Sequence, residues 1–219
     1  MPAARPLLLR AAVLALPAAC RGAADAERPP APPAIAPATS AAPPPAPPAR
    51  PGVVDSILPI PELLRRFRAD LGPDPGGLTG GAPSRDALVA RFAQAVAAND
   101  TAAIRRLVLS RREFAYLYYP SHPLARRPYE LPPALLWFQI TAGSNKGITR
   151  VLRRLGGRPL GMVAHRCESR AERQGENRVW QRCTVRRVRA PGDTVEARLF
   201  GPVVERGGRY KFVSYANDL

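Results

Sequence analysis

The spacing of the apolar residues changes once along this chain, at Gly156-Gly157. Before this pair they recur every three or four residues, as on helices, and after it they alternate with polar residues, as on strands. Turn-forming residues divide the second part into four strands, over residues 160–168, 178–189, 194–206 and 210–216. Connections this short join only antiparallel neighbours. The sequence therefore predicts an α+β fold, with N-terminal helices packed on a C-terminal four-stranded antiparallel meander.

Capping residues set the limits of the predicted helices. Asp55-Ser56, Ser84 and Asn99-Asp100 are suitable N-caps, and Ser110 forms a capping box with Glu113 ahead of an aromatic run. We expect helices over residues 57–71, 85–98, 101–109 and 134–155, with a further short start at 110. The longest of these contains Gly143–Gly147, which is predicted to kink or split it because glycine disfavours a helix interior.

Two other glycine- or proline-rich segments are not expected to form regular structure. Residues 72–83 are almost all turn formers and are interpreted as a flexible joint, and residues 120–133 hold several prolines and must be a loop. The Gly143–Gly147 segment has a superficial likeness to a phosphate loop. It lacks the Gly-Lys-Ser/Thr order and a preceding strand, which argues against phosphate binding there.

The first twenty residues have the profile of an export signal. Two arginines precede the apolar run 11–19, which is far shorter than the ~20 apolar residues that span a bilayer, and small residues then lead to Cys20. This order is typical of a bacterial lipoprotein, in which Cys20 becomes the lipidated first residue, although Leu16 lies four places before it instead of three. Ordinary cleavage after Gly22-Ala23-Ala24, which would give a secreted protein, stays open.

Composition divides the rest of the chain. Residues 21–52 are rich in Ala and Pro and cannot bury enough apolar surface to fold, so we interpret them as a disordered tether. Residues 53–83 hold a short helix and the Gly/Pro joint. Residues 84–219 are then the α+β globular domain, long enough for one hydrophobic core.

The chain is strongly basic, with 33 Lys and Arg against 17 Asp and Glu and a formal net charge of +16. Such an excess is typical of proteins that bind nucleic acid or an anionic surface. The positive residues are nearly all arginines in scattered pairs, and no zinc-ligand spacing, RNA-recognition signature or basic zipper accompanies them. Since an exported protein rarely meets nucleic acid, we expect no nucleic-acid partner. Anionic lipid, lipopolysaccharide or a polyanionic cell wall fits better, as does a merely solvated arginine-rich surface.

Cysteine usage agrees with export. If Cys20 is lipidated or removed, Cys167 and Cys183 remain, an even number in a compartment where disulfides persist. A hairpin centred on Gly175 places these two residues directly opposite each other, and the same register sets Glu168 against Arg182. Opposed residues share a face of the sheet, so the sequence predicts a disulfide between Cys167 and Cys183. Two buried free thiols are the alternative.

Two segments resemble the nuclear-transport-factor-2-like superfamily, the cone-shaped α+β fold of polyketide-cyclase-like and ketosteroid-isomerase-like proteins. Residues 86–100 are similar to its opening helix, which closes on Asn-Asp before a second helix. Residues 207–214 are similar to its final hairpin and aromatic-centred last strand. The resemblance covers about residues 84–219. It departs from the family where a capping box and a Tyr-rich segment replace a short strand, and at the extra loop 120–133.

This resemblance implies a sheet that wraps around a pocket used for catalysis or for binding. Enzymes of the family place an Asp or His there, and in this chain His165 would be the base, with Tyr116 or Tyr118 donating to a developing oxyanion. The direction in which His165 points is not fixed by the sequence, and a lone strand histidine is more often structural. Tyrosines on such a segment more often pack in a core. His122 follows Ser121, but adjacency in sequence does not make a catalytic dyad.

The expected function is therefore binding. We expect an exported, lipid-anchored envelope protein facing the periplasm, or a secreted one, whose domain binds a small ligand or an envelope protein. No metal site or cofactor is predicted. The first alternative is a cone-fold enzyme that performs proton transfer or hydrolysis on a small apolar substrate. The second is adhesion to anionic envelope surfaces through the arginines.

Overall fold

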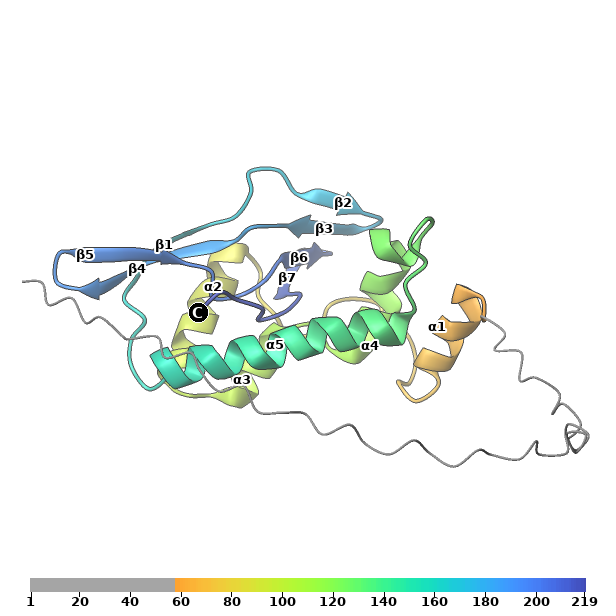
Figure 1. Cartoon of the computed structure of the whole chain (residues 1–219), viewed down its shortest axis with the longest axis horizontal. Helices are drawn as coiled ribbons and strands as arrows, with labels where there is room; N and C mark the ends of the chain where they lie inside the picture. The colour runs from red at the N-terminus through yellow and green to blue at the C-terminus, as the bar shows by residue number, and fades with distance from the viewer. Residues whose placement is uncertain (1–57) are drawn as a thin grey trace, which may run out of the picture. The chain divides into compact units, whose positions relative to one another are not determined.

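A computed structural model describes residues 58–219. The predicted export signal with Cys20, the predicted tether and the predicted Asp55-Ser56 cap lie outside these residues. Helices come first in the chain and strands follow (Figure 1). The helices are α1 (Ile60–Arg68), α2 (Arg85–Ala97), α3 (Thr101–Leu107), α4 (Arg111–Glu113) and α5 (Pro133–Leu155). The strands are β1 (Met162–Arg166), β2 (Glu172–Gln174), β3 (Asn177–Trp180), β4 (Thr184–Ala190), β5 (Asp193–Ala197), β6 (Val203–Arg206) and β7 (Arg209–Phe212). The α+β class is confirmed.

The predicted caps define the helix starts. The Ser84 hydroxyl accepts a hydrogen bond from the Ala87 N–H at 3.1 Å, and the Asp100 carboxylate accepts one from the Ala103 N–H at 2.8 Å. Each satisfies a backbone donor that the first helical turn leaves unpaired. The capping box of Ser110 is also present, before a π-helical turn, η1 (Phe114–Tyr118). Local sequence therefore sets where α2, α3 and α4 begin.

The predicted kink in the longest helix is wrong, because α5 is one continuous helix through Gly143–Gly147. These small residues serve a close approach of the C-terminal segment. A Cβ on Gly147 would stand 1.8 Å from the Tyr215 carbonyl oxygen. The Ser144 hydroxyl accepts from the Tyr215 N–H at 3.0 Å, and the Asn217 amide donates to the Gly147 carbonyl at 2.9 Å. The glycines make room for backbone and do not interrupt the helix.

The strands keep the predicted meander order but are shorter than expected. Residues 178–189 divide into β3 and β4, and residues 194–206 divide into β5 and β6, so that two sheets form, with orders β1-β4-β5 and β2-β3-β6-β7. The pairings between these strands are antiparallel, and an isolated bridge between Val108 and Phe212 is parallel. One break falls at Arg182, whose φ of 46° is left-handed and incompatible with an extended strand. Neither sheet closes on itself.

The structure joins Cys167 and Cys183 by a disulfide, with 3.9 Å between their α-carbons, and so confirms the predicted pairing. The pair lies at the division between the two sheets. Next to it, Arg166 faces Thr184 in the register that the sequence predicts, and Glu168 forms an ion pair with Arg182. Beyond the division the register shifts by one residue, since Gln174 faces Asn177 and the turn holds both Gly175 and Glu176.

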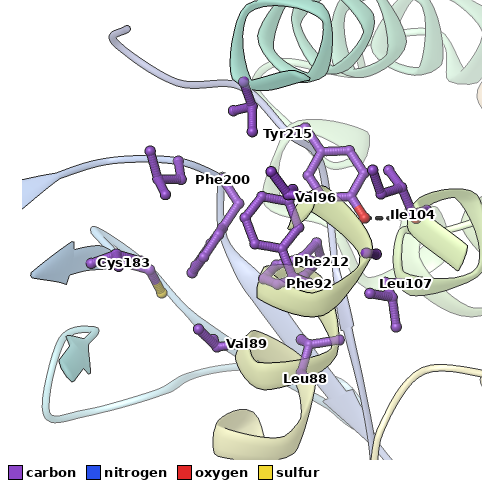
Figure 2. Close-up of a cluster of buried hydrophobic side chains, with 14 of the residues drawn as sticks. Leu88, Val89, Phe92, Val96, Ile104, Leu107, Cys183, Phe200, Phe212 and Tyr215 are labelled. Atoms are coloured by element: carbon purple, nitrogen blue, oxygen red, sulfur yellow. Dashed lines mark hydrogen bonds between the residues drawn. The ribbon is translucent and has the colours of Figure 1, made fainter. Parts of the chain in front are cut away.

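Two hydrophobic clusters form the core. The first gathers residues of α2, α3, the C-terminal half of α5, β4 and β7 (Figure 2). At its centre the Phe92 ring lies 5.4 Å from Phe200 and 5.5 Å from both Phe212 and Tyr215, between centroids. The Tyr215 hydroxyl donates to the Ile104 carbonyl at 2.7 Å, which satisfies its buried polar end. The second cluster gathers α1, η1, the N-terminal half of α5, β3 and β6.

A buried ion pair holds part of the segment 72–83 in place. The Lys211 ammonium on β7 donates to the Glu113 carboxylate at 2.8 Å, and their side chains are 3% and 1% exposed. Glu113 also accepts from the N–H groups of Thr79 and Ser110, both at 2.7 Å, and Lys211 donates to the Thr79 carbonyl at 3.0 Å. Ala82 exchanges two backbone hydrogen bonds with Tyr210. Residues 78–82 are therefore packed against β7.

Candidate functional site

The strand histidine of the predicted catalytic set faces a helix. His165 on β1 shares its face with its register neighbour Val185, which is buried, and its Nε2 lies 2.8 Å from an Asp86 carboxylate oxygen near the start of α2. The Asp86 side chain is 91% exposed, whereas the His165 side chain is 15% exposed. His165 Nδ1 is buried and has no hydrogen-bond partner among the described residues. The pair joins β1 to α2 at the surface, and the carboxylate opens to solvent.

The two candidate tyrosines lie in the other core cluster. The Tyr116 hydroxyl donates to the Gly72 carbonyl at 2.8 Å, and the Arg68 guanidinium lies 4.4 Å from its ring centre. Tyr118 is buried, and this burial raises the pKa of its hydroxyl well above the usual value, with the Glu172 carboxylate adding to the effect. Both belong to the cluster around η1, away from the cluster that α2 and β1 border. The structure does not bring His165, Tyr116 and Tyr118 together.

The neighbours Ser121 and His122 have separate partners. The Ser121 hydroxyl donates to the Tyr118 carbonyl at 3.3 Å and accepts from the Asn177 amide at 3.1 Å. The His122 ring packs against that of Tyr118 at a tilt of 50°, with 5.2 Å between ring centres, and its Nδ1 accepts from the Leu124 N–H at 3.2 Å. Burial lowers the pKa of His122, against an opposing effect of Glu172. These contacts assign both residues to local structure around the 120–133 loop.

Metal ligands do not gather in the part of the chain that the structure describes. Residues 58–219 contain no group of three or more His, Cys, Asp or Glu side chains placed to hold a metal ion. Over the same residues, no helix has the length and apolar character needed to cross a membrane.

Cations outnumber carboxylates in the described domain by 28 to 14. Nine of these cations pair with a carboxylate of residues 58–219, which leaves nineteen that do not. Some of the nineteen stack on aromatic rings instead, as Arg85 and Arg178 do on Trp180, at 4.8 and 5.1 Å from the ring centre. Most of the positive charge on the folded domain is therefore not neutralised by carboxylates of the described residues. The distribution of this charge over the surface decides what the domain can bind.

Four arginines line one concave surface, which we call the arginine groove. It is formed by Arg154, Arg158, Arg187 and Arg189 and encloses about 400 Å³. Two come from the end of α5 and the turn after it, and two come from β4. The remaining lining residues are Leu155, Pro159, Leu160, Val188 and Leu219. Within residues 58–219, no Asp or Glu side chain lines this groove.

The four guanidinium groups differ in whether they already have a hydrogen-bond or ion-pair partner. Arg158 donates to the Arg154 carbonyl at 2.8 Å, and Arg189 pairs with the Asp193 carboxylate at 2.7 Å. The Arg154 guanidinium has no hydrogen-bond or ion-pair partner in residues 58–219, and Arg187 Nε is buried without a partner there. A buried N–H without an acceptor is costly, and it marks a place where a ligand oxygen would be stabilised.

The groove was missed at the level of sequence, although a signal was present. Arg187 and Arg189 are two apart on one predicted strand, so an ideal strand places both on the same face, whereas Arg154 lies in the last turn of the predicted helix and Arg158 lies beyond its end. What the sequence does not give is the contact between the end of α5 and β4. The arginines that look scattered along the chain are gathered by the fold.

Comparisons of this chain with protein-family models, with curated proteins and with solved structures return no match. The site is therefore interpreted from the chain's own residues.

Proposed function

We propose that the protein is an exported binding protein of the cell envelope, anchored by a lipid on Cys20, whose domain binds an anionic ligand or partner. The observation that carries this proposal is the arginine groove, in which four cations line one concave surface with no Asp or Glu side chain among its lining residues in the part of the chain that the structure describes. Arginine keeps its charge in proteins, so such a surface attracts and orients anions.

Binding is a better proposal than catalysis for the same residues. Guanidinium groups hold oxyanions but do not exchange protons at neutral pH, so the groove offers no general base. The hydrogen-bonded histidine–carboxylate pair of the described domain, His165 with Asp86, opens to solvent. The tyrosines of the enzyme alternative lie in the other cluster. Proton transfer on a small apolar substrate therefore has no support from the geometry of the described residues.

The family resemblance stays part of the proposal. Helices packed against an antiparallel meander, with the Asn99-Asp100 junction between α2 and α3, support membership of the nuclear-transport-factor-2-like superfamily. The sheets are open, however, and the groove lies beside β4 and not inside a cone. We therefore propose ligand binding at this groove in place of the enclosed pocket that the family implies.

Anchoring is tested by fractionation of cells that express the full chain and its Cys20→Ala variant. We expect the wild-type protein in the membrane fraction, with a mature N-terminus at Cys20 and the mass of an attached lipid. The Cys20→Ala variant is expected to lose the lipid and the membrane association. A soluble wild-type protein that begins after Ala24 would contradict anchoring and favour simple secretion.

Anion binding is tested with the full-length Cys20→Ala chain, which carries no lipid of its own. We expect it to bind vesicles that contain phosphatidylglycerol, to ignore vesicles of phosphatidylcholine alone, and to be released by salt, because exposed charges are screened at high ionic strength. Equal binding to both vesicle types, or binding that salt does not weaken, would refute an electrostatic partner. Binding to neither vesicle type, nor to any soluble anion, would refute the proposed function.

A further inference from the structure

We infer that the arginine groove is a specific site for an organic phosphate, a phosphate group that carries an apolar substituent. This inference rests on the proposed binding of anions and names the class of ligand. Two properties of the groove lead to it, namely the guanidinium donors without partners and the apolar side chains between them.

The donors without partners point to an oxyanion with several acceptors. Arg187 Nε is buried with no hydrogen-bond partner in residues 58–219, and the exposed Arg154 guanidinium, from a different element, has none in the same residues. A phosphate offers three or four oxygens and accepts paired N–H bonds from guanidinium groups. One phosphate can therefore satisfy donors from both α5 and β4 at once.

The end of α5 does not account for all of this charge. Carbonyl groups at a helix C-terminus attract cations, and Arg158 donates a hydrogen bond to one of them, the Arg154 carbonyl. Arg187 and Arg189 come from a strand, β4, which attracts no cations in this way. Of these two, only Arg189 pairs with a carboxylate of the described residues, that of Asp193. Placing unneutralised cations around one concave surface costs electrostatic energy. A bound dianion offsets this cost.

The apolar part of the groove requires more than inorganic phosphate. Leu155 and Leu160 are each only 5% exposed, and Pro159 and Val188 complete the apolar lining. The volume of about 400 Å³ is within the range of small-molecule sites and is larger than one phosphate requires. A substituent on the phosphate would cover Pro159 and Val188, which are exposed, and gain the hydrophobic contribution that a bare anion lacks.

The experiment measures binding of soluble anions to the full-length Cys20→Ala chain by calorimetry. Phenyl phosphate is the probe, inorganic phosphate lacks the apolar part, and benzoate replaces the phosphate by a carboxylate. We expect phenyl phosphate to bind most tightly. Inorganic phosphate of equal affinity would overturn the role of the apolar lining, and benzoate of equal affinity would overturn the phosphate class.

A pair of double variants with equal loss of charge separates the groove from the general surface. Arg154→Gln with Arg187→Gln removes the two guanidiniums without partners, and Arg170→Gln with Arg209→Gln removes two exposed arginines elsewhere. We expect the first to weaken phenyl phosphate binding by about tenfold or more and the second to leave it nearly unchanged. Arg187→Lys, which keeps the charge and loses the planar fork, should also weaken binding. Circular dichroism and thermal unfolding check that each variant is folded.

Vesicles that contain phosphatidylglycerol distinguish the two sources of an organic phosphate. If the ligand is a lipid headgroup, phenyl phosphate displaces the protein from vesicles and the groove variant no longer binds them. If it is a free organic phosphate, the groove variant loses phenyl phosphate but still binds vesicles. Equal weakening of phenyl phosphate binding in both double variants would overturn the groove and leave general anion binding in place. Failure of the unmutated domain to bind any anion would overturn both proposals.

Discussion

Replacing Lys211 by Met should remove the cation from a carboxylate that cannot reach water. The Glu113 side chain is 1% exposed. After the change its carboxylate keeps, among the described residues, only the Thr79 hydroxyl and the N–H groups of Thr79 and Ser110 as donors. Removing one partner of a buried ion pair costs about 3–5 kcal/mol, a large share of the roughly 5–15 kcal/mol by which a domain is stable. Methionine matches the length of lysine, so the change tests the charge more than the packing.

The pH dependence should change sign in the same variant. In the wild type, burial would raise the pKa of Glu113, but Lys211 and the backbone N–H groups outweigh it and lower this pKa below 4.5. The resulting stability is present above the unfolded pKa and is lost as the pH falls through the folded pKa. Without Lys211 burial prevails and the folded pKa lies above the unfolded one. Lys211→Met should therefore lose stability as the pH rises above about 4.5.

Urea unfolding followed by tryptophan fluorescence, at neutral pH and at about pH 4, measures both effects. The control is the double variant of Lys211→Met with Glu113→Gln, which buries no charge and should recover part of the loss. A cost below about 1 kcal/mol for the single variant would be that of an exposed pair and would refute the reasoning. A Lys211→Met protein that loses as much stability in acid as the wild type does would also refute the reasoning.

Three further predictions follow from the packing. Changing both Cys167 and Cys183 to Ala should lower the free energy of unfolding by about 3 kcal/mol, because the disulfide closes a loop with a sequence separation of 16. In the wild type, thiol titration of the unfolded, unreduced chain should find neither of these two sulfurs free. Gly147→Ala should lower the melting temperature by the equivalent of about 1–3 kcal/mol, while Gly77→Ala, where a Cβ meets nothing within 4 Å, should leave it unchanged. His165→Gln should cost less than about 1 kcal/mol in urea unfolding, since its carboxylate partner is exposed; a larger loss would contradict a surface role.

Local signals in the sequence predict the helices well, because helix starts depend on nearby residues. Ser84, Asp100 and Ser110 each cap a helix within three residues. The strand breaks were not predictable in this way. Arg182 adopts a left-handed backbone that its residue type does not favour, and the pattern of apolar residues continues through it. The reason for a glycine at position 147 of α5 likewise involves Tyr215, far along the chain, whose carbonyl oxygen a Cβ would meet.

The disulfide could be predicted from one short stretch of sequence, whereas the arginine groove could not. The register of one hairpin places Cys167 opposite Cys183, so a short stretch of sequence contains the whole argument. The groove needs the end of α5 to meet β4, which no hairpin or cap implies. For this reason the sequence gives the sign of the charge and the arginine pairs, and only the fold shows which of them act together.

The unbroken course of α5 has a consequence for how the domain opens. Its first half contributes Leu136 to one core cluster and its second half contributes Val151 and Leu155 to the other. Because α5 packs in both clusters, the opening of either cluster exposes part of the apolar surface of this helix. We therefore expect the two clusters to exchange their backbone amide hydrogens as one cooperative unit, with closely similar opening free energies. The helix makes two hydrophobic cores into a single foldon.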